Sequence, residues 1–167
     1  MKKDYLYIVA ALLISLFIYV FYRTDKTLVN QFLINTCSLP VYHGLKMKIT
    51  EQIPLSNLVI YSLPEGLWIF CITLTSKSLY LPMCAHRFKC IYLPLIFAIS
   101  LEIMQLFHFT NGQFDFFDIG ASIFFWFIAA NIVATDDEDQ NILNVGSFKR
   151  SACVLSYSIV YLAHVIR

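Results

Sequence analysis

The chain has 167 residues, of which 59% are hydrophobic and only 14% are charged, and its formal net charge is +1. An average soluble domain is about 25% charged, so this composition is typical of a membrane protein and gives no support for nucleic-acid binding. The five cysteines are scattered without zinc-ligand spacing, and we interpret them as small buried hydrophobic residues.

The first predicted element is an apolar helix over about residues 5–22, preceded by Lys2 and Lys3 and closed by Arg23. An apolar run of roughly 20 residues is long enough to span the hydrocarbon core of a bilayer. Large aromatic residues occupy its end, where a signal peptide would have a small-residue cleavage site. We therefore expect this helix to be retained.

Residues 24–57 have mixed character, and we predict a loop that contains one short interfacial helix. Asp25 is placed to cap that helix, which is too short and too polar to span a membrane. Pro40, Gly44 and Pro54 interrupt the rest of the segment.

The second spanning helix is predicted over about residues 62–79. Its first residues contain Ser62 and, three positions later, Glu65, which is the spacing of a capping box. Pro64 suits the first turn of a helix because the N–H that proline lacks has no partner there. Residues 81–89 are expected to form a short loop.

Three further apolar helices are predicted over about residues 91–109, 116–134 and 152–166, and Asn111-Gly112 is a tight-turn signal between the first two. The pattern as a whole predicts an all-α, polytopic membrane protein. It would have about five transmembrane helices (four to five), and a single domain would cover residues 1–167.

Orientation follows from the lysines and arginines near the helix ends, which are more frequent on the cytoplasmic side. With the N-terminus in the cytoplasm, seven of the twelve lysines and arginines lie inside. The turn between the third and fourth helices contains none and is placed outside, so we predict a cytoplasmic N-terminus.

Glu102 and Gln105 are the polar residues of the third helix, and their spacing of three places both on one face. Glu102 lies about two turns from the end of the apolar run, where a carboxylate is costly. Two interpretations stay open. Either Glu102 hydrogen-bonds a neighbouring helix and fixes packing, or it contacts a lipid headgroup, a proton or a substrate.

Asp115 and Asp118 fall at the predicted N-cap and third position of the fourth helix, where carboxylates complement free N–H groups and the positive helix end. Capping alone accounts for this pair. Alternatively, the two aspartates meet Glu102 across the short hairpin and hold a hard cation such as Mg²⁺ or Ca²⁺. Mutual repulsion could also leave one of them protonated and able to act as an acid or base.

A family resemblance is carried by Glu102, Gln105, the turn with Gly112, and Asp115-x-x-Asp118 at the start of an apolar helix. This pattern resembles the VanZ-like family of small bacterial integral membrane proteins. There, a Glu-x-x-Gln helix end leads through a short loop into an Asp-x-x-Asp helix start.

The resemblance covers roughly residues 99–124, and the segment beginning at Ser62-Leu63-Pro64-Glu65 is also similar to one branch of the family. The chain carries Gln113 where many members have arginine, and Gly120-Ala121-Ser122 where many have an asparagine-containing run. The resemblance implies a location in the bacterial cytoplasmic membrane. Founding members of the family are associated with low-level resistance to the glycopeptide teicoplanin.

The leading hypothesis is a VanZ-like protein of the cell envelope that recognises a polar lipid or glycopeptide-like headgroup at the outer interface. The candidate polar site is Glu102, Gln105, Asp115 and Asp118. The alternatives are a small metal-assisted membrane hydrolase or transferase that uses the same acids, and a structural partner subunit. The predicted partners are membrane lipids, an envelope precursor or another membrane protein, and no cofactor or resident metal is predicted.

Overall fold

The chain folds mostly into helices, and a small sheet lies at one end. The computed structural model describes residues 2–25, 28–83, 86–109, 113–133, 140–143, 151 and 153–157. In chain order the elements are α1 (Lys2–Tyr22), α2 (Leu28–Cys37), α3 (Leu39–Gln52), α4 (Asn57–Ser76), β1 (Leu79–Met83), β2 (His86–Lys89), the 3₁₀-helix η1 (Cys90–Tyr92), α5 (Leu93–Leu106), α6 (Phe116–Phe127), the π-helix η2 (Ile128–Ile132) and β3 (Gln140–Asn141).

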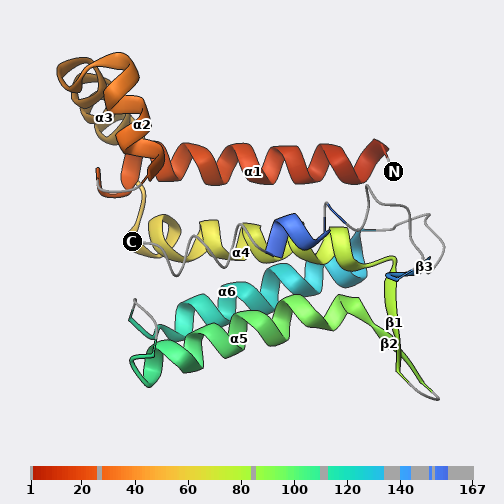
Figure 1. Ribbon diagram of the computed structural model, residues 1–167. Helices are drawn as coiled ribbons and strands as arrows, with labels where there is room; N and C mark the ends of the chain where they lie inside the picture. Colours follow the sequence, from red (N-terminus) through yellow and green to blue (C-terminus); the bar gives the residue numbers. More distant parts are fainter. Residues whose placement is uncertain are drawn as a thin grey trace.

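Helix α4 occupies the centre, between α1 on one side and the α5–α6 pair on the other (Figure 1). Its buried side chains form most of the core, whose members are Ala11, Leu67, Phe70, Cys71, Leu74 and Ala129. Gly66 lets α6 approach closely, because a Cβ at this position would collide with the ring of Phe125. The core therefore depends on a glycine at the α4–α6 contact.

Two of the described helices, residues 4–22 and 57–76, are long and apolar enough to cross a membrane. Only 17% of the first is buried inside the protein, against 56% of the second. The apolar helices 90–106 and 116–132 are shorter. The described residues therefore support a mostly helical fold, and two of their helices are candidate membrane spans.

The start of α4 differs from the prediction of a helix over 62–79. The helix begins at Asn57, where Ser56 is the N-cap and its hydroxyl accepts a hydrogen bond from the N–H of Val59 at 3.5 Å. Pro64 therefore lies inside the helix. The capping box predicted at Ser62 and Glu65 is wrong, because an earlier serine caps the helix.

The segment 24–57 also contains more helix than the one short interfacial helix that was predicted. It forms α2 and α3, and the second of these continues to Gln52 through Gly44. Pro40 falls in the first turn of α3, where a proline removes no hydrogen bond. Pro40 therefore lies at the start of a helix, although the sequence analysis predicted that it would interrupt the segment.

The residues expected to form a loop at 81–89 instead belong largely to an antiparallel hairpin. β1 pairs with β2 in the register Leu81↔Phe88, and β3 adds to β1 in parallel, which gives the order β2-β1-β3. The sheet lies at the end of the molecule that also holds the N-terminus (Figure 1).

Some predictions fall on residues that the structure does not describe. Of the predicted helix 152–166, residues 153–157 are described and are helical, and the rest lies outside the described residues, as does the predicted turn at Asn111-Gly112. The side chains of Cys71, Cys90 and Cys153 are buried free thiols, which agrees with their interpretation as small hydrophobic residues.

A network of polar contacts, here called the joint, ties α3 and the start of α2 to the C-terminal end of α1. The Nζ of Lys46 donates to a carboxylate oxygen of Asp25 at 2.6 Å and to the carbonyl oxygen of Arg23 at 2.8 Å. The hydroxyl of Tyr42 donates to the carbonyl oxygen of Val20 at 2.7 Å. These donors satisfy carbonyl groups that the end of a helix leaves without partners.

Acidification is expected to weaken the joint. The hydrogen bond from Lys46 is the main cause that holds the pKa of Asp25 below its ordinary value of 3.8. A lowered pKa means that the stabilisation is present above about pH 4 and is lost as the pH falls through the folded-state value. Because the Asp25 side chain is 38% exposed, the effect should stay below about 1 kcal/mol. Thermal unfolding measured from pH 6 down to pH 3 should show this loss of stability in wild type. The Asp25→Asn variant, which has no carboxylate to protonate at this position, should not show it.

Candidate functional site

Glu102 and Gln105 lie near the end of α5, and both are buried, with exposed fractions of 2% and 7%. The Oε2 atom of Glu102 accepts a hydrogen bond from the backbone N–H of Asp115 at 3.2 Å. This contact crosses from α5 to the start of α6. Glu102 is therefore a buried carboxyl group that faces the neighbouring helix.

Asp115 occupies the N-cap of α6, as predicted. Its backbone is extended, with φ −135° and ψ 124°, and its Oδ1 atom accepts a hydrogen bond from the N–H of Phe117 at 2.9 Å. The cap satisfies an N–H group of the first helical turn. Asp115 thus has a structural role, and its backbone N–H contacts Glu102.

Removal of this cap should destabilise the protein modestly. Asp115→Ala is expected to cost about 1 kcal/mol because an N–H at the helix start loses its acceptor. Asp115→Asn, which keeps a side-chain oxygen, should cost much less. Chemical unfolding of both variants in detergent checks this, and equal losses would contradict the capping role.

Asp118 is the third residue of α6, as predicted, but its side chain faces α4. Carboxylate oxygens of Glu65, Glu102 and Asp118 all lie within 4.8 Å of one another. We call these three residues the acidic trio. They come from three different helices, α4, α5 and α6, and Glu102 is the most deeply buried of them.

Glu65 is the member of the acidic trio that the sequence analysis assigned to a cap. Because α4 begins at Asn57, Glu65 lies in the interior of the helix, one turn after the buried Ser62. The Ser62 hydroxyl lies close to the Asp118 carboxylate. The two residues read as a capping box thus belong to the site. The signal that could have revealed Glu65 was its position in an apolar run long enough to span.

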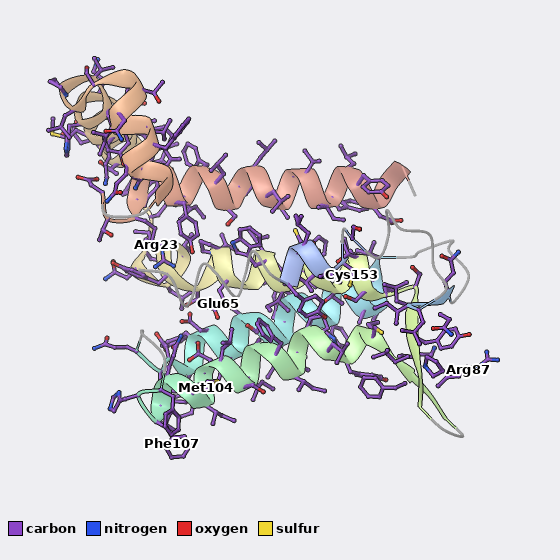
Figure 2. The ribbon with its side chains drawn as sticks, in the orientation of Figure 1. Arg23, Glu65, Arg87, Met104, Phe107 and Cys153 are labelled. Atoms are coloured by element: carbon purple, nitrogen blue, oxygen red, sulfur yellow. The ribbon has the colours of Figure 1, made fainter. Side chains whose placement is uncertain are left out.

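Arg23 lies at the end of α1, on the same side of the molecule as Glu65 (Figure 2), and interacts electrostatically with Asp118. Its guanidinium group stacks near the rings of Tyr19 and Tyr61, at 5.1 and 4.8 Å. It also donates through Nη2 to the carbonyl oxygen of Tyr61 at 3.1 Å. The guanidinium group that follows the end of α1 is therefore within electrostatic reach of Asp118 in the acidic trio.

The acidic trio is electrostatically costly. At 4.8 Å and an effective dielectric constant of 20, each ionised pair repels by about 3 kcal/mol. One oxygen of Asp118, Oδ1, is shielded from solvent and has no hydrogen-bond partner among the described residues. A proton, a metal cation or an ammonium group placed at the trio would relieve this repulsion.

Among the predicted residues, the structure brings Glu102 and Asp118 together. Asp115 contacts Glu102 through its backbone N–H, and Gln105 is buried one turn after Glu102 on α5. His108, on the same hairpin, is exposed and has a left-handed backbone, with φ 58°.

No protein-family model, curated protein or solved structure matches the chain.

Proposed function

We propose that this chain is a multi-pass, VanZ-like protein of the bacterial cytoplasmic membrane that recognises a polar lipid or glycopeptide-like headgroup at the outer interface. The observation that carries the proposal is the acidic trio, three carboxyl groups within 4.8 Å of one another in apolar helices. Polar groups of this kind inside membrane helices are costly and are usually functional.

The surface of α1 supports the membrane part of the proposal. Its outward side chains include Leu6 at 68% and Leu13 at 60% exposure. A soluble protein rarely leaves so long an apolar helix face in water. In lipid the same face has no such cost. The N-terminus is placed in the cytoplasm, in keeping with the distribution of lysine and arginine.

The position of the acidic trio supports a site near one membrane surface. Arg23, Glu65 and Phe107 lie toward one end of the helices, and Arg87 lies at the opposite end (Figure 2). Under the predicted orientation the first of these ends is the outer one. A headgroup would therefore reach the acids without entering the centre of the bilayer.

The charges favour a headgroup that carries an amine. An ammonium group donates up to three hydrogen bonds, and its positive charge would offset the repulsion within the trio. Arg23 is placed to contact a phosphate of the same headgroup, since arginine binds phosphate well. In many relatives the turn itself contains an arginine, and we assign its role here to Arg23.

The test is to identify the lipid that co-purifies with the protein by mass spectrometry. Wild type should retain an amine-bearing lipid, and Glu65→Gln should lose it while remaining folded in detergent. Glu51→Gln, a change at an exposed acid of α3 outside the site, is the matched control and should retain the lipid. The same lipid content in all three proteins would contradict the proposal.

A second candidate, a metal-assisted hydrolase or transferase, is favoured by the oxygen-only donor set of the acidic trio. Mg²⁺ and Ca²⁺ prefer carboxylate oxygens. If this candidate holds, either ion should raise the thermal midpoint of wild type but not that of Asp118→Asn. If headgroup recognition alone holds, neither ion should shift the midpoint of wild type.

A further inference from the structure

Helices α2 and α3 project from the end of α1, crosswise to it and away from α4, α5 and α6 (Figure 1). With 10 and 14 residues, they are about 15 and 21 Å long at 1.5 Å per residue. Neither helix is long enough to cross the hydrocarbon core. This pair of helices, here called the side arm, needs another environment for its apolar surface.

The direction of the side arm is fixed by the joint. Besides the contacts of Lys46 and Tyr42, the Nδ2 of Asn30 donates to the carbonyl oxygens of Tyr19 at 3.2 Å and Thr24 at 3.0 Å. At the other end of the arm, the hydroxyl of Tyr22 donates to the carbonyl oxygen of Ile53 at 2.6 Å. These bonds hold the beginning and the end of the arm against the last turns of α1.

The exposed surface of the side arm carries large apolar side chains and a lysine beside them. Phe32 is 71% exposed, and on α3 Val41 and Leu45 are 54% and 51% exposed. Lys48 is exposed as well, and it follows Val41 and Leu45 at spacings of seven and three. These spacings place the three residues along one helical stripe. A lysine beside apolar residues can bury its stem and extend its ammonium group to a phosphate.

We infer that the side arm lies in the plane of the membrane and docks on the bilayer itself, with its apolar residues at the boundary of headgroups and acyl chains and Lys48 paired with anionic headgroups. The inference rests on the proposed membrane crossing of α1, because an arm fixed crosswise to a spanning helix lies parallel to the membrane surface. The arm and α1 both expose large apolar side chains, among them Phe32 and Leu13. The occupant is therefore lipid, which covers both surfaces.

The side arm has a consequence for the candidate site. Arg23 belongs to the joint through its carbonyl oxygen and to the site through its guanidinium group. An arm held at the interface fixes the depth of Arg23, and with it the level at which a headgroup meets the acidic trio.

The experiment uses the full chain in lipid nanodiscs, with the native cysteines replaced by alanine and one nitroxide label attached through a new cysteine. At Leu13→Cys, in the middle of α1, the label should be accessible to oxygen and protected from a water-soluble nickel chelate. At Leu45→Cys the label should show the same preference at a shallower depth. Leu45→Trp, with brominated lipids as quenchers and the native chain measured in parallel to subtract the signal of Trp68 and Trp126, provides a second measurement of depth if the cysteine-free variant fails to fold.

The outcomes separate the claims. A protected label at Leu13 with a fully water-accessible label at Leu45 overturns the inference and leaves the crossing of α1 standing. Nickel access at Leu13 overturns the crossing itself. Dipolar broadening requires two labels close together. Broadening at Leu45 that disappears when each nanodisc holds at most one protein therefore identifies a second copy as the occupant and overturns the inference. In discs that contain phosphatidylglycerol, Lys48→Glu should move the Leu45 label toward water, and no movement contradicts the pairing with anionic headgroups.

Discussion

Replacement of Gly66 by alanine is expected to destabilise the protein by about 1–3 kcal/mol, the usual cost of overpacking a close contact. The added Cβ would lie 2.9 Å from the Cε2 atom of Phe125 and closer still to another atom of that ring. Because Phe125 packs against the core, its ring has little room to withdraw. Unfolding of the purified protein in detergent measures the loss.

Gly120 provides the matched control, since it is also helical but a Cβ there would have no atom within 4 Å. Gly120→Ala should be neutral or stabilising by up to about 1 kcal/mol, because alanine favours helix more than glycine does. Phe125→Leu should relieve part of the loss in Gly66→Ala. Equal effects at Gly66 and Gly120 would contradict the close α4–α6 contact.

Replacement of Glu102 by glutamine is expected to abolish headgroup binding without loss of stability. The amide keeps an oxygen that can accept the N–H of Asp115, so the contact between α5 and α6 survives. The substitution removes one carboxyl group from the acidic trio, and the smaller repulsion among the remaining two should raise the unfolding free energy by about 1–3 kcal/mol. Binding falls because the cationic group loses a carboxylate partner.

Glu102→Ala separates this expectation from a purely structural role. It leaves the Asp115 N–H without its acceptor at a buried position, which should cost about 1–3 kcal/mol. If Glu102 serves packing alone, both variants should bind wild-type lipid, and glutamine should give no gain in stability. Unfolding curves and lipid content measured on the same preparations decide between the two roles.

The sequence predicted the elements that depend on long apolar runs and on local capping. A run of apolar residues specifies α1, and Asp115 caps α6 because an aspartate before a helix start satisfies local N–H groups. The start of α4 was misplaced, since two serines in this segment offer caps and the choice between them depends on tertiary packing. Ser62 is buried against α6, and the sequence does not show this contact.

The second helix of the side arm, α3, and the β-hairpin escaped prediction for a similar reason. Pro40 is compatible either with a break or with the first turn of a helix, and the joint to α1 favours the second. The strands β1 and β2 are short. Their pairing is stabilised by hydrogen bonds between the two strands and by packing against the chain around Cys153. Such long-range contacts leave little trace in local sequence patterns.

For the site, the sequence identified Glu102 and Asp118 as acids in apolar helices but missed Glu65 and Arg23. Glu65 had a local explanation, and Arg23 lies far away in the chain, so only the packing of α1 and α4 brings either of them to the site. The VanZ-like resemblance stays a prediction. The resemblance concerns only α5 and α6. The structure adds Glu65 from α4 and Arg23 from the end of α1 to the same site.

The most direct test of the account is a thermal-shift titration of the purified protein with phosphatidylethanolamine, which carries an amine, and phosphatidylglycerol, which does not. A ligand that binds only the folded state raises the midpoint as its concentration exceeds the dissociation constant. The account predicts a larger rise with phosphatidylethanolamine than with phosphatidylglycerol, and this excess is lost when Glu65, Glu102 and Asp118 are all changed to their amides. Equal rises with the two lipids, or an unchanged rise in the triple variant, would contradict recognition of a headgroup by the acidic trio.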